Sequence, residues 1–329
     1  MFRLKNDIKG EKMKCFLSMM ILFCIGISQN SNLSGLGFYD YTYDLTENAL
    51  NNDGFALKRV YFTYKNIISD DLSVKFQTDV GEVGSDERLT VYLKKAQIDW
   101  QSPVGKITLG MQGMNMFNVT EKNWGFRFIE KSPMDKHTFS SSADMGIGYS
   151  GKINNIGYSL LVTNGAGYKK QENDKFKKIS FHGVYGQPKL VKEDGYNIGI
   201  AYSMEPYEDD SENSFNKKAM SLFAGYAANK LRIGGEYDMH TDSNSEISKQ
   251  IMALYLSYKV MDNLEGLVYV DMYDPNIDSD KNGETYIIAG LNYYATKGLI
   301  VTPNIRLTSF EDTNVESTNV FKINFQFKF

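Results

Sequence analysis

The sequence has almost no cysteine. Its two cysteines, Cys15 and Cys24, both lie within the first thirty residues, so the rest of the chain carries no thiol. This absence excludes a disulfide framework, a thiolate metal site and a cysteine nucleophile. Proline (6) and tryptophan (2) are also scarce, whereas the 22 tyrosines and 20 phenylalanines favour pleated, half-buried surfaces and membrane interfaces.

Two further absences concern partners and membrane helices. The six arginines are scattered and the net charge is −4, so no basic patch predicts a nucleic-acid partner. After residue 30, no apolar run approaches the roughly 20 residues that a membrane-spanning helix needs. If the chain enters a membrane, it must do so as a closed β-barrel, which satisfies the backbone groups of every strand in lipid.

Residues 1–28 differ from the rest and predict a secretory signal peptide. Met13-Lys14 precedes an apolar run, Cys15 to Ile27, which ends in a small-residue exit at Gly26-Ile27-Ser28. Met13 is an alternative start of the protein. A short membrane anchor is the competing interpretation, but the run is shorter than a spanning helix. We therefore expect one exported domain, residues 29–329.

From about residue 33 the chain repeats one unit, an alternating segment of about ten residues followed by a break. In 231–240, for example, Leu231, Ile233 and Tyr237 alternate with Arg232, Glu236 and Asp238. The length suits a tilted strand that crosses a bilayer. We predict an all-β, transmembrane antiparallel barrel of about sixteen strands: 33–44, 55–66, 72–80, 89–101, 106–112, 143–150, 156–165, 176–187, 196–204, 217–228, 231–240, 249–260, 264–273, 285–294, 299–309 and 321–329.

The breaks between these segments alternate in length. Short ones such as 153–155 and 261–263 carry Asn and Asp, which suit tight hairpins. Long polar ones, such as 114–142 and 274–284, alternate with them, and Pro188–Gly195 is longer than its peers on the short side. Short turns at one rim and long loops at the other are typical of bacterial outer-membrane barrels, with the short turns in the periplasm.

Sixteen strands enclose an interior too wide for side chains to fill, so we expect a water-filled lumen rather than a packed core. The face assigned to the lumen is polar and mixed in charge. Mixed charges in a constriction predict a weak ion preference, whereas rings of one sign would be selective. The candidate pore-lining and constriction residues are Arg59, Lys75, Lys95, Glu121, Lys122, Arg127, Glu130, Lys131, Arg232 and Arg306.

The final segment, 321–329, alternates strictly and stops on Phe329. It resembles the closing strand of bacterial outer-membrane barrels, and the resemblance implies that Phe325, Phe327 and Phe329 form the signal read by the barrel assembly machinery. The longest connection, 113–142, is similar in position to the third extracellular loop of sixteen-stranded porins, which folds into the lumen and narrows it.

Shorter segments resemble the phosphate-selective porin group, namely 55–65, 110–113, 127–130 and 143–148. The sparse arginines of this chain differ from the arginine ladders of anion-selective members. The resemblance implies a homotrimer in the lipid bilayer of the bacterial outer membrane. It also implies passive diffusion of small hydrophilic solutes or ions.

One loop predicts a structural calcium site. Asp278, Asp280 and Asn282 place oxygen ligands at alternate positions, and Gly283 follows at the sixth position of the pattern. A full site has a bidentate glutamate at the twelfth position, where this chain has Ala289. The competing interpretation is an acidic surface loop, 274–284, closed by an Asn-Gly turn.

We expect neither an enzyme nor any other cofactor. The three histidines, His137, His182 and His240, lie on separate segments without metal-ligand spacing, and no nucleophile elbow, zinc signature or phosphate loop is present. An outer-membrane barrel with an enzymatic or adhesive role stays the alternative hypothesis. Ion conductance separates the channel from both.

Overall fold

The computed structural model describes residues 31–47, 49, 53–82, 89–172 and 174–329. The predicted signal peptide, 1–28, lies outside these residues. The first eight strands are β1 (Ser31–Asp44), β2 (Gly54–Ile67), β3 (Leu72–Glu82), β4 (Leu89–Ser102), β5 (Gly105–Gly113), β6 (Ala143–Ile153), β7 (Ile156–Thr163) and β8 (Lys178–Gly186). The others are β9 (Gly195–Glu208), β10 (Ser214–Ala228), β11 (Leu231–Asp242), β12 (Ile247–Met261), β13 (Leu264–Asp274), β14 (Glu284–Thr296), β15 (Leu299–Phe310) and β16 (Thr318–Lys328).

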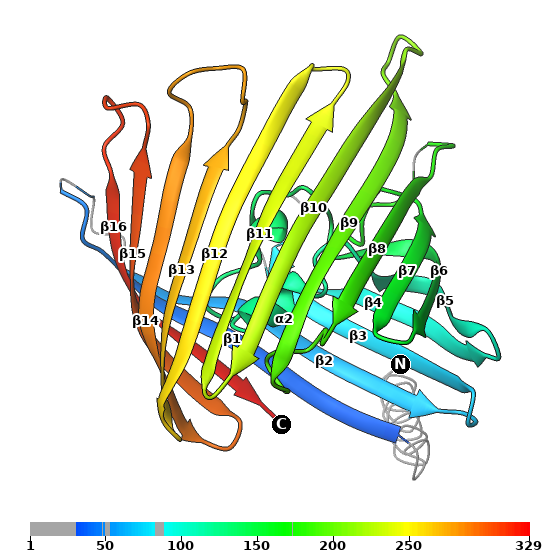
Figure 1. Ribbon diagram of the computed structural model, residues 1–329, viewed down its shortest axis with the longest axis horizontal. Coiled ribbons are helices and arrows are strands. Elements are labelled where there is room, and N and C mark those ends of the chain that lie inside the picture. Colours follow the sequence, from blue (N-terminus) through cyan, green and yellow to red (C-terminus); the bar gives the residue numbers. More distant parts are fainter. Residues whose placement is uncertain (1–30, 48, 50–52, 83–88, 173) are drawn as a thin grey trace, which may run out of the picture.

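The sixteen strands form one closed antiparallel barrel, as the alternating segments predicted (Figure 1). Every strand pairs with its sequence neighbours, and β1 pairs with β16 to close the ring. Two short helices, α2 (Thr120–Trp124) and α3 (Pro133–Lys136), lie in the long connection between β5 and β6. None of the described helices is long and apolar enough to cross a membrane.

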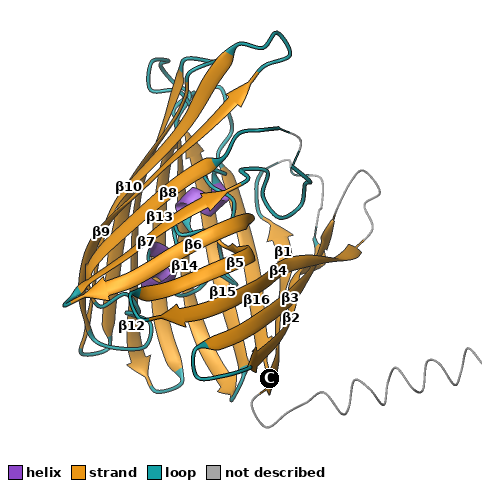
Figure 2. Ribbon diagram, turned by 90° about the vertical axis from the view of Figure 1, so that its right-hand side faces the viewer, coloured by secondary structure: helices purple, strands orange, loops and turns teal. Residues whose placement is uncertain are grey.

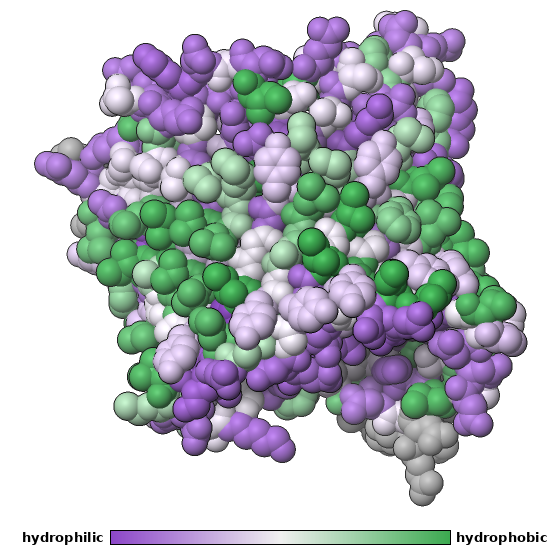
Figure 3. Space-filling view, in the orientation of Figure 1, coloured by the Kyte–Doolittle hydropathy of each residue, from purple (hydrophilic) through white to green (hydrophobic). Residues whose placement is uncertain are grey.

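Alternation along the strands gives the barrel an apolar outer belt. Figure 3 shows this belt as a band of apolar residues across the middle of the molecule, with polar residues above and below it. Leu222, Leu254 and Ile305 of the belt are each close to half exposed. Inward-facing neighbours on the same strands are buried and polar, such as Ser221 and Asn304. Exposed apolar residues that ring a closed barrel indicate a surface that faces lipid.

A bulge in β2 changes which of its residues face inward. β2 pairs with β1 through Arg59 and then through Leu57, so Lys58 is an extra residue between them. Phe55 and Leu57, at odd positions, face outward before the bulge. Phe62, at an even position, faces outward after it. Lys58 and Arg59 consequently both face the interior.

β4 contains a second bulge of the same kind. It pairs with β3 through Lys95 and then through Leu93, which leaves Lys94 as the extra residue. Val91 and Leu93 are exposed on the outer side before the bulge, as is Ile98 after it. Two further consecutive lysines, Lys94 and Lys95, are thereby directed inward.

The connection 114–142, called the inner segment below, lies inside the barrel, where Figure 2 shows its helices enclosed by strands. Its Trp124, Phe126 and Phe128 pack against inward-facing apolar residues of the wall, such as Tyr255 and Tyr269. A second cluster joins other residues of the segment to β9, β10 and β12: Met116, Phe117, Met134, Phe139, Ala201, Ala219, Ile251 and Ala253. The expectation of an interior without a packed core was therefore wrong for this side of the barrel. The inner segment supplies the apolar atoms that a wide barrel lacks.

The unusually long connection between β8 and β9 also reaches inward. Leu190 of this connection is buried, and it lies so near Gly225 of β10 that a side chain there would touch both Leu190 and Asn123 of α2. Asn123 and Asn197 of β9 exchange two amide hydrogen bonds of 2.9 Å. This connection therefore supports the inner segment at the rim that carries the short turns.

Candidate functional site: the barrel constriction

The inner segment is anchored by aromatic side chains against one side of the barrel. Trp124 is 1% exposed, and its ring lies 5.0 Å from that of Tyr269 and 6.0 Å from that of Tyr255. Phe126 packs edge-on against Trp124 at 5.2 Å. Aromatic rings bury large areas, so this cluster fixes the segment more firmly than hydrogen bonds alone would.

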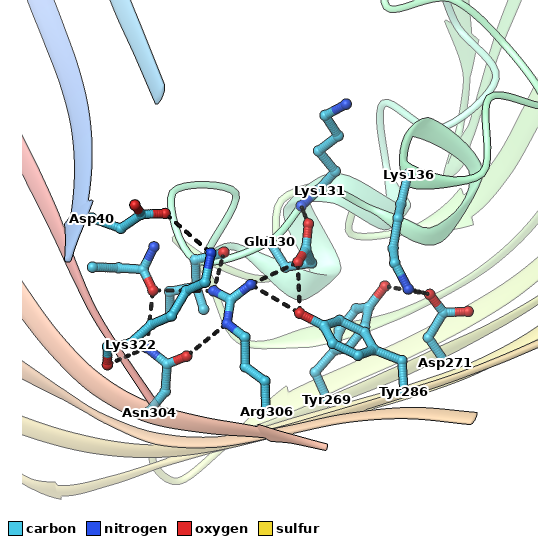
Figure 4. Close-up of polar contacts among 12 residues, drawn as sticks. Asp40, Glu130, Lys131, Lys136, Tyr269, Asp271, Tyr286, Asn304, Arg306 and Lys322 are labelled. Carbon is cyan, nitrogen blue, oxygen red and sulfur yellow. Dashed lines mark hydrogen bonds and ion pairs between the residues drawn. The ribbon is translucent and has the colours of Figure 1, made fainter. Parts of the chain in front are cut away.

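Arg306 of β15 anchors the middle of the segment through a network of hydrogen bonds (Figure 4). Its Nη1 lies 2.9 Å from both Glu130 Oε2 and the Tyr286 hydroxyl, and its Nη2 donates to the Ile129 carbonyl at 2.7 Å. Asn324 of β16 donates to the Phe128 carbonyl at 3.1 Å. Arg306 is 7% exposed, so its charge is paired and shielded from water.

A second anchor joins the end of the segment to β13. Asp271 is fully buried, and its Oδ2 accepts a hydrogen bond from Lys136 Nζ at 2.9 Å. His137 Nε2 lies 2.8 Å from the same carboxylate oxygen. The His137 ring also stacks on Tyr273 with centroids 4.0 Å apart. A buried carboxylate needs such partners to stay ionised. The sequence alone suggested no partner for Asp271 or for His137.

The other face of the inner segment carries Arg127, which points toward β2. Its Nη2 donates to Asp135 Oδ2 at 2.6 Å, its Nε lies 2.9 Å from Glu121 Oε2, and its Nη1 donates to the Tyr61 hydroxyl at 3.4 Å. Burial on its own would lower the pKa of the Arg127 guanidinium, but Glu121, Tyr61 and Asp135 outweigh it and raise the pKa. Arg127 is therefore a fixed positive charge.

The barrel wall that faces Arg127 is also basic. Arg59 lies 3.2 Å from the fully buried Asp79 and hydrogen-bonds Tyr61. Lys94 is 2% exposed, lies 3.9 Å from Asp79, and places its ammonium 4.1 Å from the centre of the Tyr168 ring. The β4 bulge thus brings Lys94 to the same buried carboxylate that pairs with Arg59.

The other predicted constriction residues divide between these two sides. Lys75 and Lys95 face inward on the basic wall, and Lys95 interacts electrostatically with Lys75 and with the charged residues of the inner segment. Arg232 instead donates to the Trp124 carbonyl at 3.1 Å and lies over the Phe126 ring, so it holds the anchored side. Lys131 is exposed above the segment (Figure 4).

Lys122 lies on α2, on the inner segment itself. Burial lowers the pKa of its ammonium, and the nearby Lys189 lowers it further, while Glu121 opposes both effects. Lys189 belongs to the long connection between β8 and β9. The two lysines therefore place positive charge where that connection meets the inner segment.

Sequence reasoning missed Lys58 and Lys94, because strict alternation assigns them to the outer face. A signal was present nonetheless. In both strands the apolar residues change parity at a pair of consecutive basic residues, Lys58-Arg59 and Lys94-Lys95. A change of parity within one strand predicts a bulge, since one extra residue restores the apolar side chains to the lipid face.

The predicted calcium loop connects β13 and β14. Its Asp278 and Asp280 are exposed, and Asn282 Nδ2 donates to the Asn276 carbonyl at 3.0 Å. Within the ranges that the structure describes, no group of three or more His, Cys, Asp and Glu side chains is arranged to hold a metal ion. The calcium site stays a prediction.

The terminal phenylalanines lie on the outer face of β16, at the seam with β1. Phe327 stacks on Tyr39 with centroids 5.7 Å apart, and Phe325 pairs in register with the same tyrosine. Gly37 faces the Phe327 ring so closely that an added Cβ would lie 2.2 Å from it. Phe329 is 71% exposed. Their role as an assembly signal stays a prediction.

Comparison with known proteins identifies the fold. No protein-family model and no curated protein matches the sequence. Among solved structures, OmpF of Salmonella typhi in complex with daunomycin is 14% identical with a TM-score of 0.67, and the match covers 91% of this chain and 97% of that chain. An anion-selective porin from Comamonas acidovorans is 12% identical with a TM-score of 0.67, over 91% and 99%.

A third match is the outer-membrane channel DcaP of Acinetobacter baumannii, which is 12% identical with a TM-score of 0.64, over 91% and 97% of the two chains. The closed barrel, its apolar belt and these matches confirm the predicted architecture. The chain has the fold of the Gram-negative outer-membrane porins.

Proposed function

We propose that this protein is an outer-membrane channel for passive diffusion of small hydrophilic solutes or ions. The observation that carries the proposal is the asymmetric placement of the inner segment. Its apolar face packs against the β12–β14 side, whereas Arg127 on its other face points to the charged wall of β2–β4. Charged groups that face one another across a barrel interior create a field that acts on passing ions.

The partners follow from the same proposal. The apolar belt faces the lipid bilayer, and the terminal strand presents its phenylalanines to the barrel assembly machinery. The resemblance to porins supports a homotrimer. None of these partners requires a catalytic centre.

The test is reconstitution of the purified protein in planar lipid bilayers. We expect ion conductance, and we expect deletion of residues 115–140 to raise the single-channel conductance severalfold, because the segment occupies the interior. The matched control shortens a long connection outside the barrel, such as 209–213 between β9 and β10, and should leave conductance nearly unchanged.

Two results would contradict the proposal in different ways. A correctly folded barrel that carries no current would favour the enzymatic or adhesive alternative. A barrel that conducts equally with and without residues 115–140 would keep the channel but remove the narrowing role of the inner segment.

A further inference from the structure

A cavity of about 270 Å³ lies between the inner segment, β1–β2 and β15–β16. Its wall combines a few apolar groups with an excess of basic side chains. The lining includes only two acidic residues, Asp40 and Glu130. The basic residues that line it are Lys58, Arg59, Arg127, Lys131, Arg306 and Lys322.

The cavity lining has more basic groups than its two carboxylates can pair with. Lys58 and Lys322 share the single carboxylate of Asp40, at 3.5 and 3.4 Å. Glu130 forms an ion pair with Arg306. Lys131 is exposed and its side chain extends away from this network (Figure 4). The Lys58 and Lys322 ammonium groups therefore have one carboxylate between them, and Lys131 adds a third basic residue to the lining.

The guanidinium groups of Arg59 and Arg127 form ion pairs with carboxylates that lie outside the cavity lining. Arg59 pairs with Asp79, and Arg127 pairs with Glu121 and Asp135, none of which lines the cavity. These carboxylates hold the guanidinium groups in place without adding acidic oxygens to the cavity lining. A fixed guanidinium is suited to carboxylate or phosphate oxygens.

The basic groups come from three directions. β2 supplies Lys58 and Arg59, the inner segment supplies Arg127 and Lys131, and β15–β16 supplies the others. The volume corresponds to about nine water molecules at roughly 30 Å³ each, which is too large for one monatomic ion and suits a small organic molecule. A ligand with an acidic group at each end could reach two of these directions at once.

We propose that this cavity is a binding site for small organic anions with two or more acidic groups, such as dicarboxylates. The proposal rests on the channel function proposed above and names the solute class that the channel prefers. Lys58, Lys322 and Lys131 are its selectivity residues. The site belongs to the constriction itself, because Arg59, Arg127 and Lys131 line both. It opens toward the long connections, since Lys58 and Lys322 lie near the strand ends that follow two of them.

The test measures current through single channels in potassium chloride while succinate is added to one side. We expect succinate on the side of the long connections to reduce the chloride current in a saturable way. Butyrate, with one carboxylate, and butanediol, with none, should act only at much higher concentration. Voltage that draws anions toward the constriction should strengthen the effect.

The variant for this site is the double substitution Lys58→Gln/Lys322→Gln. It should weaken the apparent affinity for succinate at least tenfold, because it removes both ammonium groups around Asp40. The matched control, Lys217→Gln/Lys249→Gln, removes the same charge from inward positions of β10 and β12, outside this cavity. It should change the affinity less than about threefold, since distant charges are screened.

Equal weakening in both double variants would overturn the site in favour of a general field. Equal effects of succinate and butyrate on the unmodified protein would overturn it as well, and this measurement does not depend on how the variants fold. A channel that conducts but ignores succinate refutes only the binding site. A barrel without any conductance would instead refute the channel proposal.

Discussion

Two sides of the same barrel follow the same alternation and yet present different chemistry to the interior. On the anchored side, inward positions of β12–β14 hold Tyr255, Tyr269 and Ile288, all nearly fully buried. On the basic side, inward positions of β2–β4 hold Arg59 and Lys94. Alternation decides only that a residue faces inward. The groups that it meets there decide its chemistry: aromatic rings on the anchored side, and the buried carboxylate of Asp79 on the basic side.

The comparison also explains what holds the inner segment in one position. Aromatic and aliphatic contacts hold one face of the inner segment, and Arg306 and Asp271 hold its backbone and its lysine. Arg127 can then present a fixed charge to the opposite wall, because the segment that carries it cannot easily move. The anchored side is thus a support for the electrostatics of the basic side.

The largest effect on conductance is expected when the anchored side loses the Trp124 ring. Trp124→Ala should destabilise the packing of the inner segment by about 3–5 kcal/mol, the usual cost of removing a buried tryptophan. Single-channel recordings should show larger and noisier conductance levels. The matched control, Trp100→Ala on the outer face of β4, removes a 43% exposed ring and should leave the conductance levels as they are.

If Trp124→Ala conducts with the same amplitude and noise as the unmodified protein, the aromatic cluster does not hold the segment. The polar anchors would then have to suffice, and the contrast between the two sides would be weaker than the burial suggests.

A smaller effect is expected on the basic side from Lys94→Gln/Lys95→Gln. A unit charge about 8 Å from an ion in water contributes roughly 0.5 kcal/mol, or a factor of about two, in favour of the anion and against the cation. Removing two such charges should therefore lower the anion-to-cation permeability ratio by at least about tenfold. Reversal potentials in a potassium chloride gradient measure this ratio. Lys175→Gln/Lys177→Gln, in the connection between β7 and β8, is the control and should shift the ratio by less than about twofold.

The smallest effect is expected from removing a bulge. Deletion of Lys94 joins Leu93 to Lys95, which keeps Leu93 outside and Lys95 inside, so the barrel should still assemble. Deletion of Asp238 from β11, which has no bulge, would turn every apolar residue on one side of the cut to the wrong face. The electrophoretic shift between heated and unheated samples reports the folded barrel in both variants.

A folded yield for the Asp238 deletion equal to that of the Lys94 deletion would contradict the interpretation of the bulge. It would mean that the apolar belt does not constrain the register of these strands.

Most of the fold could be predicted from the sequence, because strand alternation and turn composition are local. The predicted segment 231–240 corresponds to β11, and 264–273 corresponds to β13, each within two residues. The position of the inner segment followed from a resemblance in connection length. Its attachment could not be predicted, since Glu130 and Arg306 are 176 residues apart in the chain.

The sequence by itself determined an amphipathic barrel of about sixteen strands, because apolar and polar residues alternate along each strand and the apolar ones face lipid, apart from the residues beside the bulges. Only the tertiary structure decided which inward residues support the inner segment and which stay with the charged wall. Those pairings depend on how distant strands and the inner segment meet in space. Even the charge of the cavity beside β15–β16 arises from lysines and arginines that share no stretch of sequence.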